Sequence, residues 1–364
     1  MLPFFAEEYG NPHSVEHAMG RRADEAVEAA RAAIAALIGA QPSEVVFTSG
    51  ATESNNIAIK GAARYALASG SERRRIVTVA TEHKCVLAGV TDLAREGFEP
   101  VLLGVGPDGL VDPDALAEAL RTPTLLVSVM AVNNEIGVIQ DLPRLAALAK
   151  GAGALFHTDA AQAVGKIPLD VAGWAIDLLS ISGHKVYGPK GVGALYVRRR
   201  PRVRLEPLFS GGGQERGLRS GTLPAPLIVG LGEACRIAGA EMAEEAERLV
   251  GLRNRLLSAL EATIPAIRVN GSMRARIPGN LNLTFPAATA VELMERMPEI
   301  CVSTGSACSS ATIEPSYVLS ALGLSEADAA RTLRIGIGRF TSAPDIDRAA
   351  AALTAAHAPA PAAA

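Results

Sequence analysis

Short apolar runs alternate with helical patterns from about residue 44 to residue 200. The runs are rich in β-branched residues and continuously hydrophobic, which predicts strands that are buried on both faces. A mostly parallel sheet with helices on both faces accounts for this pattern. The predicted strands are 44–48, 76–80, 100–103, 125–130, 154–158, 176–181 and 194–197, and the predicted helices between them are 14–38, 53–69, 84–97, 113–121 and 141–152.

The pattern changes after about residue 224. Residues 225–262 are rich in Ala, Glu, Arg and Leu and predict one long helix, followed by strand signals at 268–270 and 280–285 and a helix near 344–355. We therefore expect an α/β fold of two domains. The predicted divisions are a large domain over 11–242, a small α+β domain over 243–356 with residues 1–10 packed on it, and a disordered Ala/Pro tail over 357–364.

The composition narrows the class of protein. The 364 residues are 49% hydrophobic and 20% charged, which is typical of a globular chain, and the net charge of -3 argues against a nucleic acid or an anionic membrane as partner. No apolar run reaches the roughly 18 residues of a membrane span, and the first residues lack the basic start of a secretory signal. Four cysteines are too few for a disulfide scaffold, so we expect a soluble, cytoplasmic protein.

Small residues follow the first predicted strand. Residues 49–54, Ser-Gly-Ala-Thr-Glu-Ser, open the next helix, where free backbone N–H groups and the helix dipole favour a phosphate. An ordinary helix N-cap would use the same residue types, and taken alone this is the more common explanation. The segment lacks the G-x-x-x-x-G-K-[ST] pattern, which argues against ATP or GTP hydrolysis.

Polar residues also follow the other strands, and in an open α/β sheet the carboxyl ends of the strands meet at the ligand-binding edge. Each alone could be a cap, a core histidine or a surface lysine, but together they favour a binding site. A lysine, a carboxylate, a phosphate cradle and a flat histidine are what pyridoxal 5'-phosphate (PLP) requires. Lys185 has the best position of the six lysines and Lys84 is its rival; no metal site is predicted.

Six segments resemble the cysteine desulfurases that feed iron–sulfur cluster and nitrogenase assembly. The resemblance runs from about residue 9 to 350, and its motifs lie at 47–56, 81–84, 132–137, 182–191, 211–222 and 303–308. It implies a PLP-dependent transferase of fold type I, acting as a homodimer on L-cysteine. This sequence departs from the family pattern in beginning after the family's first strand and in having Gly336 where serine is common.

The resemblance also implies residue roles. Lys185 forms the Schiff base with the cofactor, Asp159 pairs with the pyridine nitrogen, and His83 stacks on the ring and acts as acid and base. The remaining implied contacts are Gln162 and Asn134 with the ring hydroxyl; Ala51, Thr52, Ser182 and His184 with the phosphate, joined by Thr222 of the partner subunit; Arg334 with the substrate carboxylate; and Asn11 at another edge of the active site.

Cys308 lies among Ser, Gly and Ala residues, which cannot bury a thiol well. The resemblance implies that Cys308 takes the substrate sulfur as a persulfide, releases L-alanine, and passes the sulfur to an acceptor such as an iron–sulfur scaffold protein. Cys235 and Cys301 are expected to be buried, and Cys85 to pack beside His83. The alternatives are a selenocysteine lyase or another fold-type-I PLP lyase, and a sulfur-assembly scaffold without catalysis.

Overall fold

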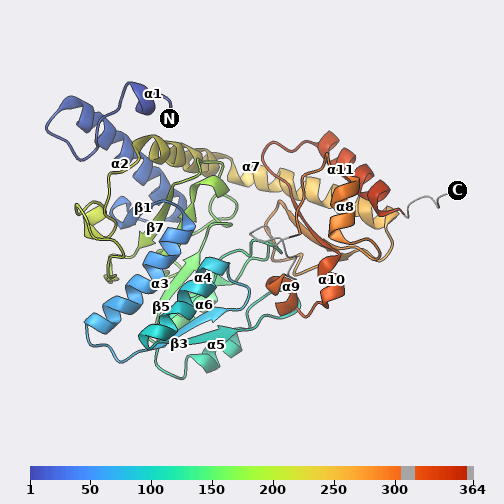
Figure 1. Ribbon diagram of the computed structural model, residues 1–364, viewed down its shortest axis with the longest axis horizontal. Helices are drawn as coiled ribbons and strands as arrows, with labels where there is room; N and C mark the ends of the chain where they lie inside the picture. Colours follow the sequence, from blue (N-terminus) through green and yellow to red (C-terminus); the bar gives the residue numbers. More distant parts are fainter. Residues whose placement is uncertain (305–315, 359–364) are drawn as a thin grey trace. The chain divides into compact units, whose positions relative to one another are not determined.

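The computed structural model describes residues 1–304 and 316–358 (Figure 1). The chain forms two compact units. The first consists of Met1–Leu103, Val111–Val132 and Gln140–Met242, and the second of Gly104–Leu110, Asn133–Ile139 and Ala243–Ala364. Two short segments from the first half of the chain therefore belong to the second unit, which the sequence pattern does not predict.

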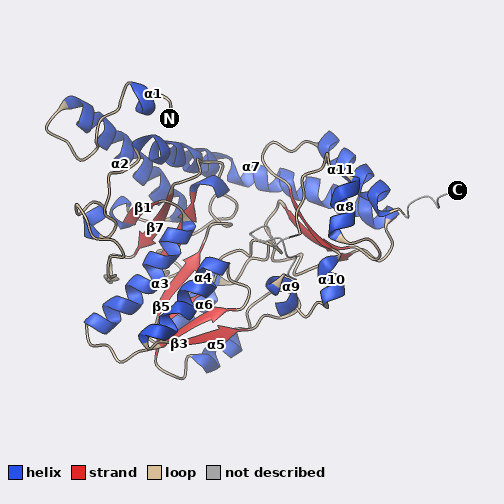
Figure 2. Ribbon diagram, viewed as in Figure 1, coloured by secondary structure: helices blue, strands red, loops and turns tan. Residues whose placement is uncertain are grey.

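A seven-stranded sheet lies at the centre of the first unit, with strands in red in Figure 2. The strand order is β1-β7-β6-β5-β4-β2-β3. β7 is antiparallel to β1 and β6, and every other pair is parallel. The mostly parallel fold predicted from the apolar runs is therefore confirmed. The strands are β1 (Val45–Thr48), β2 (Arg75–Val79), β3 (Glu99–Leu103), β4 (Thr124–Ser128), β5 (Leu155–Asp159), β6 (Leu178–Ser182) and β7 (Gly193–Val197).

Helices of the first unit follow the predicted order with shifted ends. The predicted helix 14–38 begins only at Ala18, because the His17 ring caps it by accepting the Gly20 N–H at 3.0 Å. Ile57 and Ile59 pack with Val86 and Val90 in one apolar cluster, which joins α3 to α4. The helices are α1 (Pro3–Ala6), α2 (Ala18–Ile38), α3 (Ala51–Ala68), α4 (Lys84–Asp92), α5 (Pro113–Ala119) and α6 (Leu142–Gly151).

Residues 1–10 belong to the first unit, which corrects the expectation that they pack on the small domain. An ion pair of 2.6 Å joins Glu8 to Arg22 of α2. The Met1 side chain lies against Gly230, in the part of α7 (Ala225–Thr263) that belongs to the first unit. Ionic and apolar contacts both hold this segment there.

The second unit contains a three-stranded antiparallel sheet in the order β10-β9-β8. Leu281, Leu283 and Leu333 point into an apolar core with α8 and α11, whereas Asn280, Asn282 and Thr284 alternate with them on the other face. The sequence pattern missed β10 because only its alternate residues are apolar. The elements are β8 (Arg268–Val269), β9 (Asn280–Thr284), β10 (Thr332–Gly336), α8 (Ala290–Arg296), α9 (Tyr317–Ala321), α10 (Glu326–Ala330) and α11 (Ala343–His357).

Within the described ranges, no helix combines the length and the apolar character that a membrane crossing requires. In the same residues, no three His, Cys, Asp or Glu side chains gather as a metal ion would need.

Candidate active site

Asp159 lies at the carboxyl end of β5 and is only 5% exposed. Its Oδ1 accepts the Ala161 N–H at 2.9 Å, and its Oδ2 accepts from Asn55 Nδ2 at 2.7 Å. Burial raises the pKa of Asp159 above its usual value, while the two N–H donors and the nearby His83 and Lys185 act in the opposite direction. The electrostatic influence of both residues on Asp159 shows that the first unit brings these three predicted site residues into one neighbourhood.

His83 caps the N-terminus of α4. Its Nδ1 lies 3.3 Å from the backbone N of Cys85, which donates to it, and 3.0 Å from the Cys85 Sγ. The ring is therefore fixed from its Nδ1 side by one residue of its own helix. Such a fixed ring suits stacking on a flat ligand, which is the role that the resemblance implies.

Lys185 ends a short 3₁₀ turn that directly follows β6. Its side chain is exposed, in contrast to the buried Asp159. The turn is tight because a Cβ atom at Gly183 would lie 2.9 Å from the carbonyl oxygens of Pro189 and Val192. Glycine at position 183 is therefore required for the loop that presents the lysine.

Two predicted phosphate-binding residues flank this glycine. Ser182 Oγ lies 3.1 Å from His184 Nδ1, so the two side chains are hydrogen-bonded to each other. Partial burial and the neighbouring Lys185 and Lys190 lower the pKa of His184. His184 is therefore held as a neutral hydrogen-bonding group at neutral pH.

The N-terminus of α3 provides the other half of the predicted phosphate cradle. Gly50 caps the helix at φ 148° without a side-chain hydrogen bond, so no side chain of the cap covers the first N–H groups at Ala51 and Thr52. Gly193 of β7 lies so close to Gly50 that only glycine fits at position 193, because a Cβ atom there would lie 2.6 Å from the Gly50 Cα. A cavity of about 700 Å³ opens here, and its lining includes Ser49, Thr52, Lys60, Arg64, and Arg219 in an ion pair with Glu53.

Gln162 is oriented by a lysine. Lys166 Nζ donates to Gln162 Oε1 at 2.9 Å, and because an ammonium group can only donate, the oxygen of the amide must face the lysine. The amide NH₂ group is then left for an acceptor elsewhere, as a contact with a ring hydroxyl would need.

The second unit brings together two further predicted residues. Arg334 Nη1 donates to the Asn134 carbonyl at 3.0 Å. The loop 133–139 is held on the polar face of the small sheet, where Asn280 and Asn282 donate to the Glu135 carbonyl at 3.2 Å and 3.4 Å. The side-chain Oδ1 of Asn134 is buried without a partner among the described residues.

Two predicted site residues, Asn11 and Thr222, are not brought to these groups by any contact in the described part of the chain. Asn11 is exposed, and its Oδ1 accepts the N–H of His13 at 3.0 Å. Thr222 is also exposed. Cys308 lies outside the described residues.

The other thiols differ in their surroundings. Burial raises the pKa of Cys235 to about 12, as expected for a packed thiol. Cys301 is exposed, which corrects the expectation that it is buried; its apolar neighbours in the sequence do not cover it. Cys85 is half-buried and contacts the ring of His83.

Sequence reasoning missed Asn55 and Glu82. Asn55 lies one turn into α3, where the 3.6-residue period turns it toward Asp159. Glu82 is fully buried, and its Oε1 accepts the N–H of Met130. Burial, and then the charge of Asp159, raise the pKa of Glu82 well above its usual value. Its signal in the sequence was a carboxylate directly before His83 at the end of an apolar predicted strand.

The raised pKa of Glu82 predicts a pH-dependent cost in stability. The contribution of Glu82 to the free energy of unfolding is fully present below the unfolded pKa of about 4.3 and is lost as pH rises through the folded pKa. The loss is about 1.4 kcal/mol for each unit by which the folded pKa exceeds the unfolded pKa. Glu82→Gln keeps an acceptor for Met130 and cannot ionise. We expect the free energy of unfolding of Glu82→Gln, measured by urea titration, to rise relative to that of the wild type as the pH increases above 4. The exposed Glu118→Gln should show no such gain, and a constant difference for Glu82→Gln would contradict the assignment.

The residues present fit PLP. A buried carboxylate is held by two N–H donors, an exposed amine lies at the end of β6, and the cap of α3 leaves its first N–H groups open. Asn55 Oδ1 is buried with no hydrogen-bond partner in the described chain, so a polar atom in this region remains to be satisfied. These are the groups that a phosphorylated pyridine aldehyde would use.

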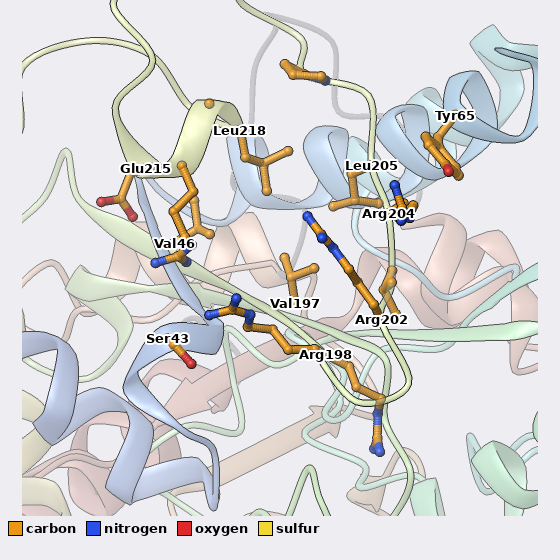
Figure 3. A pocket seen from close by; sticks show the side chains of 15 residues that line it. Ser43, Val46, Tyr65, Val197, Arg198, Arg202, Arg204, Leu205, Glu215 and Leu218 are labelled. Carbon is orange, nitrogen blue, oxygen red and sulfur yellow. The ribbon is translucent and has the colours of Figure 1, made fainter. Parts of the chain in front are cut away.

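A separate cavity of about 270 Å³ shares no residue with the predicted site (Figure 3). Arg198, Arg202 and Arg204 line it, and Glu215 lies at its edge. Glu215 belongs to a buried ion pair, accepting from both terminal nitrogens of Arg31 at 2.8 Å and 2.9 Å. It also accepts the N–H of Phe47 at 2.7 Å, so the middle of the glycine-rich segment 211–222 is tied to β1.

Known proteins with similar sequences agree with a PLP site. Residues 1–349 match the family described as "Aminotransferase class-V". The chain belongs to the class-V aminotransferases. It is 54% identical over 347 residues to "Cysteine desulfurase, mitochondrial" of Arthroderma benhamiae, covering 95% of this chain and 69% of that protein. It is 51% identical over 349 residues to "Cysteine desulfurase IscS" of Rickettsia bellii, covering 96% of this chain and 84% of that one.

Solved structures with similar folds agree with this family. A "NIFS-LIKE PROTEIN" matches with a TM-score of 0.89 and 35% identity over 97% of this chain and 93% of that chain. "SspA in complex with cysteine" matches with a TM-score of 0.80 and 40% identity, covering 92% of each. The predicted family and the fold-type-I architecture are thereby confirmed, and PLP is the cofactor of this family.

Proposed function

We propose that this chain is a PLP-dependent cysteine desulfurase that converts L-cysteine to L-alanine and holds the sulfur as a persulfide for iron–sulfur or related assembly. The observation that carries the proposal is the buried Asp159, held by Asn55 and Ala161 and within the electrostatic reach of His83 and Lys185. The similarity to proteins named cysteine desulfurase supports the substrate.

PLP, when bound, supplies an electron sink for the pair released at the substrate Cα. Asp159 would face its pyridine nitrogen, since both carboxylate oxygens are already oriented by N–H donors. Lys185 would hold the cofactor, and its amine would be the base that removes the Cα proton of the substrate. Arg334 would grip the substrate carboxylate with its planar fork. Ala51, Thr52, Ser182 and His184 would hold the phosphate, and Gln162 and Asn134 the ring hydroxyl.

Cys308 would then act as a thiolate on the substrate sulfur. The S–S bond forms as the C–S bond breaks, and the electron pair of the broken bond stays with the carbon fragment, which takes up a proton and leaves as L-alanine. His83 is the side chain best suited to carry that proton, because contacts with Cys85 fix its ring from the Nδ1 side. The persulfide leaves the protein when an acceptor thiol attacks it.

A homodimer is part of the proposal. Thr222 would reach the phosphate in the partner subunit, and Asn11 would lie at another edge of the active site. The ion pair between Glu215 and Arg31 supports this, because it holds the middle of segment 211–222 while Thr222 at the end of the segment is exposed. Cys85, Cys235 and Cys301 are free thiols, which supports a reducing compartment, the cytoplasm.

Dilution should weaken PLP retention if the site is shared. We expect Thr222→Ala to lower PLP affinity about tenfold at concentrations where the dimer is intact, because a hydrogen bond to a charged phosphate is lost. The exposed Thr122→Ala is the matched control and should retain PLP as the wild type does. Fluorescence titration with PLP, alongside ultracentrifugation, measures both quantities. A monomer with full cofactor occupancy would contradict the shared site.

L-cysteine and L-selenocysteine added to the purified protein separate the proposal from its alternatives. We expect alanine from L-cysteine, with sulfane sulfur bound to the protein. Turnover of selenocysteine without that bound sulfur would support the lyase. A protein without the visible absorbance of bound PLP, and without alanine production, would support the non-catalytic scaffold.

A further inference from the structure

A chain of hydrogen bonds behind the predicted PLP-facing groups joins Asp159 to His83. It passes through two residues to which the resemblance assigns no role, Asn55 and Cys85. The Asn55 Nδ2 lies 2.7 Å from Asp159 Oδ2 and 3.2 Å from Cys85 Sγ. The Cys85 Sγ in turn lies 3.0 Å from His83 Nδ1. All four residues belong to the first unit.

The direction of each hydrogen bond follows from donor chemistry. The Asn55 NH₂ group carries two hydrogens, and it donates one to the carboxylate and one to the sulfur. A flipped amide would turn its oxygen toward the Asp159 carboxylate, and two acceptors facing each other repel. The Asn55 Oδ1 accordingly remains buried without a partner in the described chain, which shows that the amide is held by its nitrogen side.

The Cys85 thiol keeps its proton at neutral pH, because burial, and then the charge of Asp159, raise its pKa to about 11. Its sulfur accepts from Asn55 and also forms a side-chain hydrogen bond with Thr52. Its S–H can donate to His83 Nδ1, which lies 3.0 Å away. The backbone N–H of Cys85 also donates to His83 Nδ1, with 3.3 Å between the two nitrogens. Two donors on Nδ1 leave no room for a proton there, so the ring proton must sit on Nε2.

We propose that Cys85 is a positioning residue that, held by Asn55, fixes His83 as the Nε2–H tautomer with its Nδ1 directed away from the reacting atoms. The proposal rests on the proposed function for the meaning of His83 in catalysis, but the tautomer itself does not depend on it. The consequence is that the only ring nitrogen able to exchange a proton at the site is Nε2.

Nitrogen NMR of the full chain labelled with ¹⁵N-histidine tests the tautomer directly, with PLP bound and after its removal. His83→Gln assigns the resonances. We expect wild-type Nδ1 to resonate as an unprotonated nitrogen and Nε2 as a protonated one. In Cys85→Ala the Nδ1–H form should become populated, because only the longer backbone hydrogen bond still opposes it. Cys85→Ser, whose hydroxyl also accepts and donates, should restore the wild-type spectrum.

Kinetics supply a second readout. We expect Cys85→Ala to lower kcat about tenfold with KM unchanged, less than the ~10⁴-fold that a fully wrong histidine tautomer costs, because the backbone donor remains. Cys85→Ser should stay within about twofold of the wild type, which a role in packing alone would not require of serine over alanine. A proton on wild-type Nδ1, or a Cys85→Ala spectrum identical to the wild type, would overturn the proposal. Failure of cysteine turnover with the expected spectra would instead count against the proposed function.

Discussion

Lys185→Ala should leave a folded protein that cannot attach PLP covalently and that turns over L-cysteine at least about 10³-fold more slowly, because both the covalent anchor and the base that removes the Cα proton are lost. The lysine is exposed at the end of a tight turn, so its removal opens no cavity in the core. Borohydride reduction and peptide mapping of the wild type should place the cofactor on Lys185.

Lys84→Ala is the matched control for this variant. Lys84 is also exposed, follows a strand of the same sheet, and stands directly beside His83 in the sequence. It should keep the PLP absorbance and a turnover close to that of the wild type. A reduced cofactor found on Lys84, or full PLP attachment in Lys185→Ala, would contradict the position of the site at the end of β6.

Cys308→Ser should separate substrate activation from sulfur transfer. The variant should keep the absorbance of bound PLP and still change its spectrum on addition of L-cysteine, because neither step needs the thiol. It should neither accumulate protein-bound sulfane sulfur nor release alanine above background, since a serine hydroxyl cannot take up the sulfur. Parallel assays of alanine and of sulfane sulfur measure the two halves of the reaction.

Cys301→Ser is the sharpest control for sulfur transfer, because Cys301 is an exposed thiol of the same unit. It should remain active, as should Cys85→Ser and Cys235→Ser, with any loss of stability within about 3 kcal/mol. Alanine formed by Cys308→Ser at the wild-type rate would show that this thiol is not the sulfur acceptor, and the lyase would become the better interpretation.

The sequence predicted the parts of the fold that depend on local pattern. All seven strands of the large sheet were found, because strands buried on both faces are continuous apolar runs. β10 was missed because only its alternate residues are apolar, with Arg334 on the other face. The antiparallel direction of β7 and the inclusion of 104–110 and 133–139 in the second unit depend on contacts between distant segments, which periodicity does not encode.

The rule that ligands bind beyond the strand ends predicted Asp159, His83 and Lys185 as site residues. In the structure His83 and Lys185 both lie near enough to influence the pKa of Asp159. Asn55 was missed, and Cys85 was expected only to pack beside His83, because their roles lie in contacts with other side chains. An asparagine inside a helix and a thiol at the second position of another helix have no pattern of their own. Such residues become visible only when the hydrogen bonds from Asp159 are followed.

The central claim is that this chain moves sulfur from L-cysteine onto its own Cys308. A single turnover of the PLP-loaded protein with ³⁵S-labelled L-cysteine, without reductant and followed by alkylation and peptide mapping, measures it most directly. The proposed function predicts one alanine for each labelled sulfur, with the label on the peptide that contains Cys308. Alanine formed with the label released as free sulfide, or found on the peptide of Cys301, would contradict it.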